Sequence, residues 1–379
     1  MPNFIRPLYS GLVFLPLMVI SICSAAYANA SPIASNSPKD NIHPNIDHHL
    51  SESLYPDEAN ITEKIADIIE ILIRKEYSTG IALRDAHPKA HGCVRAEFKV
   101  DEVLPKNLVQ GVFIPGKTYQ AWIRFSNGSK DAQQADIKKD ARGMAIKLLA
   151  VPGEKLLDDE TSTQDFIMIN HPVFFVNDPV RYISFMQDIN SDRFFNKLHI
   201  PFALGAKGTW IALNTRNKIS NPLQTRYWSM VPYQLGIGTD RQAIKYSAQA
   251  CSTVTDPLPH APHHNFLREK LRQYLQKSEA CMEFLVQPRT SNTMSVEDSM
   301  TEWQESEAPF YKVATIRIPP QVFDTPDQNK FCENLSFTPW HTLPEHKPLG
   351  VINRMRKVIY DRISEVRHDM NSINRSEPH

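Results

Sequence analysis

The sequence has no excess of charge of either sign and little glycine. Its 379 residues include 42 lysines and arginines against 42 aspartates and glutamates, so the formal net charge is zero. Nucleic-acid-binding domains carry a basic excess that neutralises phosphates, and this class of partner is therefore not expected. Only 13 residues are glycine, and none form a Gly-x-Gly-x-x-Gly turn, so the fingerprint of a dinucleotide-binding fold is lacking.

The most apolar run lies at the N-terminus and is short. Residues 12–22 are almost wholly apolar, follow Arg6, and precede small residues ending in Ala-Tyr-Ala and Ala-Asn-Ala. This order is typical of a secretory signal peptide, and the run is too short to span a bilayer well. The sequence predicts a signal peptide over 1–30, cleavage after Ala28 or Ala30, a periplasmic or secreted protein, and no stable membrane span after cleavage.

Cysteine is scarce as well. Four cysteines would remain after cleavage, an even number that an oxidising compartment would allow to pair. Their spacings match no zinc site, and the sequence leaves open both the connectivity and whether they are free thiols: Cys93, Cys251, Cys281 and Cys332.

Composition and periodicity divide the rest of the chain. Residues 31–57 are rich in Ser, Pro, Asn and His and predict a flexible leader, with the folded domain over 58–375. Apolar residues at helical spacing predict helices over 58–77, 268–276 and 353–370. Alternating residues predict strands over 94–100, 119–127, 143–151, 165–169, 279–287 and 311–318, and two further segments, 228–235 and 242–250, are expected to be extended.

These elements favour an α+β fold built on an antiparallel barrel or sandwich. In the clearest strand, Val94, Ala96, Phe98 and Val100 alternate with charged residues, as expected of a half-buried strand. Short alternating strands with turns between them are typical of antiparallel architectures. The segment 192–221 follows no clear pattern.

The last predicted helix carries an unusual charged seam. Arg356, Tyr360 and Arg367 are spaced at i, i+4 and i+11, next to an apolar stripe, so they share one side of the helix. A guanidinium lowers the pKa of a nearby phenol, and a phenolate suits ferric iron. Taken alone, the helix could equally present a solvated polar face.

Other candidate residues are spread along the chain. Arg84 and His87 precede the first strand, Arg124 and Ser126 share a face of the second, and Asn170 follows the fourth. His87 also stands four residues before His91, the spacing of a helical metal pair, but Pro88 and the lack of a third ligand argue against zinc. Aromatic residues such as Phe175 and Tyr182 could line an apolar pocket or belong to an ordinary core.

Together these segments resemble the haem catalases in their sequence motifs and in the order of those motifs. Arg-Asp-Ala-His-Pro-Lys (84–89) resembles the family's R-x-x-H-x-K segment, and Ile-Arg-Phe-Ser (123–126) its V-R-F-S strand. Asp-Ala-Arg-Gly-Met-Ala-Ile-Lys (140–147) is similar to D-P-R-G-F-A-x-K, and Asn-His-Pro-Val-Phe-Phe-Val-Asn-Asp-Pro (170–179) to N-T-P-I-F-F-x-R-D-P. The last helix resembles the proximal R-x-x-x-Y helix and its later arginine.

The resemblance implies a fold, a cofactor and roles for individual residues. The fold would be a catalase-like antiparallel β-barrel core with flanking helices and a C-terminal proximal helix. The cofactor would be haem b, with Tyr360 as the phenolate ligand of the iron. The resemblance implies His87 as the distal acid–base residue, Asn170 as a donor to peroxide and Ser126 as the partner of the imidazole. Its implied haem contacts are Arg84, Arg124 and Arg367 at the propionates, Arg356 beside the phenolate, and Phe175 and Tyr182 as walls.

The chain also differs from the family's usual sequence motifs. Ala86 stands where a larger valine is usual, His91 and an extra residue follow His87, and the proximal helix keeps only its tyrosine and arginines. These departures resemble a small, divergent branch that includes peroxidases and fatty-acid hydroperoxide enzymes such as the allene oxide synthases. We therefore expect decomposition of hydrogen peroxide or reduction of peroxides, in the second case with an organic reductant. A lipid-hydroperoxide-transforming enzyme and a non-enzymatic haem-binding protein remain alternatives, and the sequence is compatible with a homo-oligomer.

Overall fold

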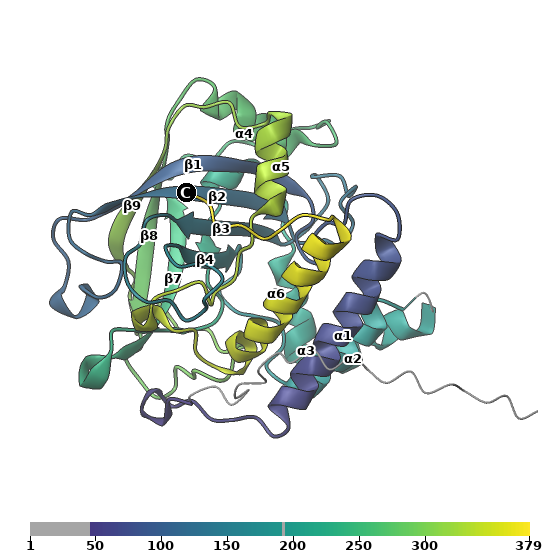
Figure 1. Cartoon of the computed structure of the whole chain (residues 1–379), viewed down its shortest axis with the longest axis horizontal. Helices are drawn as coiled ribbons and strands as arrows, with labels where there is room; N and C mark the ends of the chain where they lie inside the picture. Colours follow the sequence, from purple (N-terminus) through teal and green to yellow (C-terminus); the bar gives the residue numbers. More distant parts are fainter. Residues whose placement is uncertain (1–45, 192–193) are drawn as a thin grey trace, which may run out of the picture. The chain divides into compact units, whose positions relative to one another are not determined.

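The strands form one antiparallel sheet that closes into a barrel (Figure 1). The computed structural model describes residues 46–191 and 194–379, and the predicted signal peptide lies outside them. The strand order is β5-β4-β3-β2-β1-β9-β8-β7-β6, and β5 also pairs with β7, which closes the barrel. The strands are β1 (Ala90–Val100), β2 (Thr118–Asn127), β3 (Arg142–Leu148), β4 (Gln164–Ile169), β5 (Tyr227–Trp228), β6 (Tyr233–Leu235), β7 (Gln242–Ala250), β8 (Ala280–Pro288) and β9 (Tyr311–Ile318).

Alternation along the strands fills the barrel with aromatic and aliphatic side chains. In β1 the predicted inward residues are buried, while Arg95, Glu97 and Lys99 are exposed. Phe98, Phe166 and Phe284 meet in the interior with ring centroids 4.7–6.1 Å apart, at separations favourable for aromatic pairs. The prediction of an α+β fold with an antiparallel barrel is confirmed.

Four helices, α1, α2, α3 and α6, lie together on one side of the barrel, and α4 and α5 lie beside β1 (Figure 1). The isoleucines of α1 pack against the apolar stripe of α6, which includes Met355, Ile359 and Ile363. Among the described residues, no helix has the length and apolarity needed to cross a membrane. The helices are α1 (Glu58–Glu76), α2 (Pro179–Ile189), α3 (Phe194–Thr215), α4 (Phe266–Leu275), α5 (Pro326–Asn334) and α6 (Val351–Met370).

The structure differs from the predicted elements in three places. The unassigned segment 192–221 contains α3, whose pattern is interrupted by Pro201 and by Gly205 at φ 70°. Helices α2 and α5 were not predicted, because both are short and neither buries an apolar stripe: the buried residues are Pro179 and Asp188 in α2 and Cys332 in α5. The predicted extended segment 228–235 is divided between β5 and β6 by a turn at Met230 (φ 63°).

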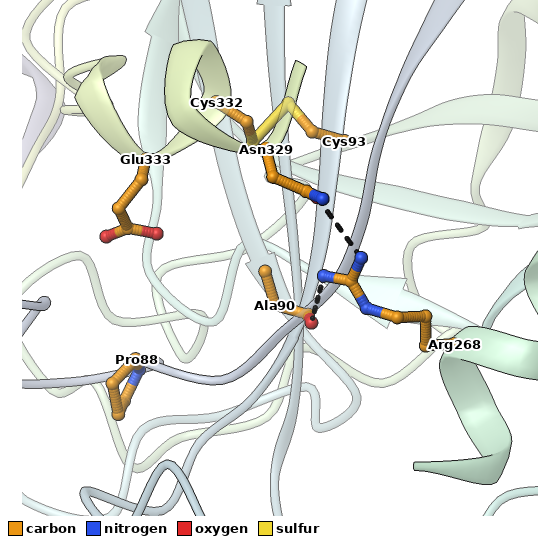
Figure 2. Close-up of a pocket in the computed structure, with 7 residues that line it drawn as sticks. All are labelled: Pro88, Ala90, Cys93, Arg268, Asn329, Cys332 and Glu333. Atoms are coloured by element: carbon orange, nitrogen blue, oxygen red, sulfur yellow. Dashed lines mark hydrogen bonds between the residues drawn. A yellow bond between two sulfur atoms is a disulfide. The ribbon is translucent and has the colours of Figure 1, made fainter. Parts of the chain in front are cut away.

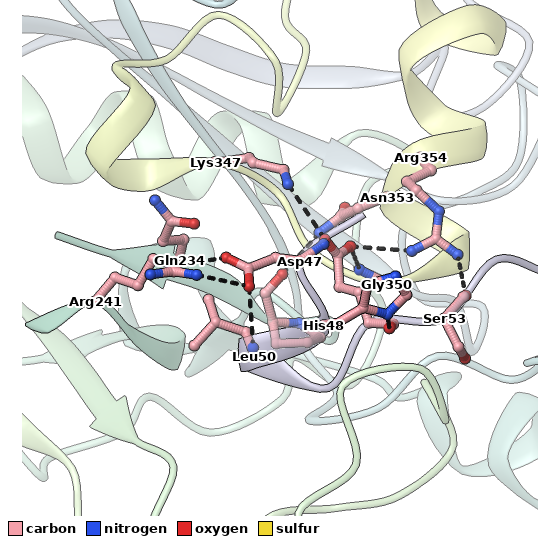
Figure 3. Close-up of polar contacts among 12 residues, drawn as sticks. Asp47, His48, Leu50, Ser53, Gln234, Arg241, Lys347, Gly350, Asn353 and Arg354 are labelled. Carbon is pink, nitrogen blue, oxygen red and sulfur yellow. Dashed lines mark hydrogen bonds and ion pairs between the residues drawn. The ribbon is translucent and has the colours of Figure 1, made fainter. Parts of the chain in front are cut away.

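Residues 46–57 contact the domain instead of forming part of a flexible leader. Asp47 pairs with Arg241 at 2.6 Å, and Glu52 pairs with Lys347 at 3.2 Å (Figure 3). The polar composition of this segment therefore reflects buried and half-buried ion pairs, which composition alone cannot distinguish from solvated residues.

The four cysteines form two disulfides. Cys93 of β1 is bonded to Cys332 of α5, and Cys251, just after β7, is bonded to Cys281 of β8. The first closes a loop of 239 residues and fixes α5 beside the barrel wall. Cross-links of this kind stabilise a fold by a few kcal/mol, in the range of about 2–4.

Two arginines of α6 each meet three carboxylates, in contrasting surroundings. Arg354 is buried, with 2% of its side chain exposed, and pairs with Glu52, Glu58 and Glu297 at 2.8–3.0 Å. Arg362 is 32% exposed and pairs with carboxylates of α1: Glu63, Asp67 and Glu70. Arg354 thus joins the N-terminal segment, α1 and the 295–300 loop to the start of α6.

Arg354→Ala should therefore destabilise the fold far more than Arg362→Ala. Removing Arg354 leaves buried carboxylates without their counter-charge, which costs about 3–5 kcal/mol. Removing the exposed Arg362 should cost about 0–1 kcal/mol. Urea unfolding of the two variants measures the difference, and equal losses would contradict the assigned role of Arg354.

Candidate functional site

Strand register brings three residues to one end of the barrel wall. Ser126 of β2 pairs with Gly143 of β3, which in turn pairs with Ile169 at the end of β4. Asn170 continues this ladder, because its backbone N–H donates to the carbonyl of Arg142 at 3.0 Å. Two of the predicted site residues, Ser126 and Asn170, therefore lie on either side of Gly143.

His87 lies against this end of the wall. Its Nδ1 is 3.0 Å from Ser126 Oγ, the contact that the resemblance implies. A Cβ on Gly143 would lie 2.5 Å from the same Nδ1, so only glycine leaves room for the imidazole. His87 also has φ +60°, a conformation that is uncommon outside glycine and that concentrates at functional sites.

The imidazole of His87 is held neutral. Burial, together with the positive charges of Arg124, Arg356 and Arg84, lowers its pKa to about 3. A neutral imidazole keeps one nitrogen lone pair, so His87 can accept a proton from a bound ligand.

Asn170 is fixed at both ends of its amide. Its Oδ1 accepts from the backbone N–H of Arg142 at 2.6 Å, and its Nδ2 donates to the carbonyl of Thr215 at 3.3 Å. An amide has two N–H donors. Among the described residues, the second has no partner, which leaves it for a ligand.

Helix α6 contributes the other side of the site. The guanidinium carbon of Arg356 lies 5.9 Å from the ring centroid of Tyr360 and 5.7 Å from that of Phe174. The Arg356 side chain also donates to Asn353 Oδ1 at 3.4 Å. Arg356 therefore lies over the face of the phenol ring of Tyr360. Because its charge also lowers the pKa of His87, the two predicted sides border one region.

Aromatic side chains border the same region. Phe175 contacts Phe174, Tyr182 and Phe185, with ring centroids 4.5–6.4 Å apart. All four are only partly buried, unlike the fully buried rings of the barrel core. Burial raises the pKa of Tyr182, whose phenol therefore stays neutral. Partly exposed aromatic faces suit a flat apolar ligand better than an ordinary core.

Three predicted cofactor-binding arginines converge on one carboxylate. Arg84 Nη1 lies 2.5 Å from Glu333 Oε1, and Arg124 Nη2 lies 3.8 Å from Glu333 Oε2. Arg367 donates to the backbone carbonyl of Glu333. Burial alone would raise the pKa of the Glu333 carboxyl, but the charges of Arg84, Arg124 and Arg367 together lower it.

Positive charge is in surplus in this arginine cluster, which we define as Arg84, Arg124 and Arg367. Burial and the charge of Arg84 lower the pKa of both Arg124 and Arg367 to about 9. Within the described residues, Nε of Arg124 is buried without a hydrogen-bond partner. Three guanidinium groups share one carboxylate, so two charges lack a counter-charge within this group. A haem has two propionates, and the residues present therefore fit a haem.

A cavity of about 150 Å³ lies beside Glu333, the carboxylate that the arginine cluster shares (Figure 2). Arg268 lines it and donates to Ala90 O and Asn329 Oδ1, each at 3.1 Å, and Glu333 and the Cys93–Cys332 disulfide complete the wall. Its volume is below the roughly 300 Å³ at which ligand pockets begin, so this cavity is too small to hold a porphyrin.

The structure does not bring His87 and His91 together as a metal pair. His91 points elsewhere, with Nε2 2.7 Å from Asn127 Oδ1 and Nδ1 3.8 Å from Asp136. Among the described residues, the one cluster with metal-ligating groups is Glu160, Asp165 and His341. The ammonium of Lys147 pairs with both carboxylates there, which makes it a buried ion-pair network.

Sequence reasoning missed two residues of the site. Gly143 lies within the matched 140–147 segment, and its closeness to His87 follows from strand register, which the sequence does not reveal. Glu333 lies in the unpredicted helix α5, far from every motif, and no sequence signal points to it.

Comparison with known proteins shows which fold and which family model this chain is similar to. Residues 70–196 match the family model for catalase, and no curated protein matches the sequence. Among solved structures, a fungal catalase has a TM-score of 0.60 at 15% identity and is matched over 78% of this chain and 60% of its own. Catalase A from Saccharomyces cerevisiae has a TM-score of 0.60 at 17% identity, over 85% and 67% of the two chains. A bacterial catalase has a TM-score of 0.57 at 15% identity, over 87% and 65%. The chain thus has the catalase fold and spans only about 60% of the fungal catalase.

Gly143→Ala should displace the imidazole of His87. The added Cβ would meet His87 Nδ1 at 2.5 Å and Ser126 Oγ at 2.7 Å, and overpacking of this kind costs about 1–3 kcal/mol. Imidazole nitrogen shifts in NMR spectra should move and the unfolding midpoint should fall. Ser126→Ala, which removes the hydroxyl without adding volume, is the matched control. Unchanged His87 signals in Gly143→Ala would show that the ring does not lie against β3.

Proposed function

Taking this chain as a member of the catalase superfamily, on its fold and on the family match of residues 70–196, we propose that it is a haem-dependent enzyme acting on peroxide. The observation that carries the proposal is the surplus of positive charge in the arginine cluster, because a buried cation without a counter-ion is costly and two carboxylates would relieve it. The neutral His87 and the half-buried Tyr360 border the same region.

Each named residue would have a distinct part in holding the cofactor. Tyr360 would ligate the iron through its phenol oxygen, with the guanidinium of Arg356 over its ring, 5.9 Å from the ring centroid. The arginine cluster would pair with the propionates, since a guanidinium fork matches a carboxylate. Phe175 and Tyr182 would pack against the ring. When bound, haem held by a phenolate supplies the redox chemistry that breaks the O–O bond of a peroxide.

On the other side, His87 would move a proton between the two peroxide oxygens. A neutral imidazole takes the proton from one oxygen and returns it to the other, which leaves as water or alcohol. Ser126 Oγ, at 3.0 Å from Nδ1, keeps the ring oriented while this happens. Asn170 would position the peroxide through its second amide proton.

The substrate and the compartment belong to the same proposal. Hydrogen peroxide with catalase or peroxidase turnover is the leading assignment, with an organic reductant in the peroxidase case. Both disulfides suit an oxidising compartment, which supports export of the protein to the periplasm or the medium.

An organic hydroperoxide is the second candidate, and Ala86 favours it. This small residue precedes His87 and is exposed, so it leaves more room beside the imidazole than a larger side chain would. Oxygen release from hydrogen peroxide by haem-loaded protein, measured beside the loss of a fatty-acid hydroperoxide, separates the two. Rapid oxygen release assigns hydrogen peroxide, and loss of the lipid substrate without oxygen assigns the alternative.

Two substitutions should separate cofactor binding from reactivity. Tyr360→Phe should lose haem or the charge-transfer bands of a phenolate ligand. His87→Ala should bind haem normally but react with peroxide about 10²–10⁴-fold more slowly, the usual contribution of a general acid–base group. Haem titration and stopped-flow absorption measure both. Normal ligand bands in Tyr360→Phe, or an undiminished rate in His87→Ala, would refute the corresponding assignment.

The rate of reaction with peroxide should stay level as the pH falls from 7 to 5. His87 has a pKa of about 3, so its imidazole is neutral from pH 7 to pH 5 and becomes protonated only near pH 3. An ordinary histidine, with a pKa of about 6.5, would lose its lone pair within the range. A decline of the rate with a midpoint near 6 would contradict the buried, neutral imidazole. Circular dichroism at each pH controls for unfolding.

A further inference from the structure

Helix α3 exposes large apolar side chains on both sides of its break. Leu198, Phe202, Trp210 and Leu213 are between 53% and 77% exposed. Leu198 and Phe202 are four residues apart before Gly205, and Trp210 and Leu213 are three apart after it, so each pair shares one side of its half-helix. Single exposed apolar residues are common, but four on one helix indicate an interaction surface.

The opposite side of α3 is well packed, so the exposure does not reflect a loosely placed helix. Ala203, Leu204 and Ile211 are buried, and Ile211 belongs to a cluster with Val173, Met300 and Phe175. A Cβ on Gly208 would lie only 2.6 Å from the carbonyl oxygen of Phe175. Helix α3 therefore lies directly against the segment that carries the aromatic side chains of the site.

Charge along this helix has one sign. The segment 194–218 contains Lys197, Lys207, Arg216 and Lys218, all exposed, and no aspartate or glutamate. Of these, Lys207 is 3.8 Å from the carboxylate of Asp298. Apolar residues with tryptophan, flanked by lysine and arginine, are the composition of helices that lie in a lipid interface. A second copy of the same face would instead bring like charges together.

We propose that the exposed face of α3, defined by Leu198, Phe202, Trp210 and Leu213 with its flanking basic residues, docks this protein on an anionic phospholipid bilayer. The apolar side chains enter the boundary between headgroups and acyl chains, and the basic residues pair with lipid phosphates. Docking does not require the cofactor, so this proposal is independent of the proposed function. It would place the membrane surface one helix away from Phe175.

The proposal is tested by co-sedimentation of the protein with vesicles. Vesicles of phosphatidylglycerol should bind the protein, and vesicles of phosphatidylcholine should bind it much less, because the basic residues then lack an anionic partner. The emission of Trp210 should shift to shorter wavelength on binding to phosphatidylglycerol. Arg216→Glu/Lys218→Glu should abolish the preference for the anionic lipid.

A pair of double variants isolates the apolar face. Phe202→Ser/Trp210→Ser should lower binding to phosphatidylglycerol roughly tenfold or more, a loss of about 1.4 kcal/mol or more. The matched control, Val103→Ser/Val322→Ser, removes residues that are 88% and 60% exposed in loops outside α3 and should bind like the wild type. Circular dichroism verifies that both variants fold.

Three results would overturn the proposal. The first is equal vesicle binding by both double variants, and the second is no vesicle binding by the wild type. The third is a concentration-dependent dimer in sedimentation velocity that Phe202→Ser/Trp210→Ser dissociates, which would assign the face to a second copy of the chain. Haem binding and peroxide turnover are measured separately on the same samples. A failure of membrane docking would therefore leave the proposed function unaffected, and a failure of the proposed function would leave membrane docking unaffected.

Discussion

The arrangement of the site depends on buried positive charge that is only partly balanced. The arginine cluster converges from three separate parts of the chain: the loop before β1, strand β2 and helix α6. Its one carboxylate, Glu333, is fixed by α5, which the Cys93–Cys332 disulfide joins to the barrel. Because desolvated guanidinium groups repel one another, the fold gains stability from any ligand that supplies carboxylates there.

The barrel and α6 hold the remaining residues of the site in place. Strand register fixes Ser126, Gly143 and Asn170 at one end of the wall, and the glycine leaves the space that His87 occupies. Helix α6 is held by its apolar packing on α1 and by the buried ion pairs of Arg354. Tyr360 and Arg356 are consequently presented by a rigid helix, and His87 by a loop whose unusual backbone conformation is supported by Arg124, which donates to the His87 carbonyl at 2.9 Å.

Much of the fold and part of the site could be predicted from the sequence. The elements and residues that were missed were missed for physical reasons. Strong periodicity predicted β9 with its correct bounds and α1 and α6 to within two residues, since each of these elements buries one face. Helix α3 was missed because its exposed residues are as apolar as its buried ones, which removes the contrast on which a periodic pattern rests. The predicted arginines, His87 and Ser126 do lie together. The local sequence could not predict Glu333 or the role of Gly143, because both depend on contacts between residues far apart in the chain.

The central claim is that the surplus charge of the arginine cluster serves to bind the two propionates of a haem. The most direct measurement is an absorption titration of the cofactor-free protein with haem and, in parallel, with its dimethyl ester, which keeps the ring and iron but carries no carboxylate. If the arginine cluster binds the propionates, we expect saturable binding of one haem per chain, with the dimethyl ester bound at least about tenfold more weakly. Equal affinity for the two compounds, or no specific binding of haem, would contradict it.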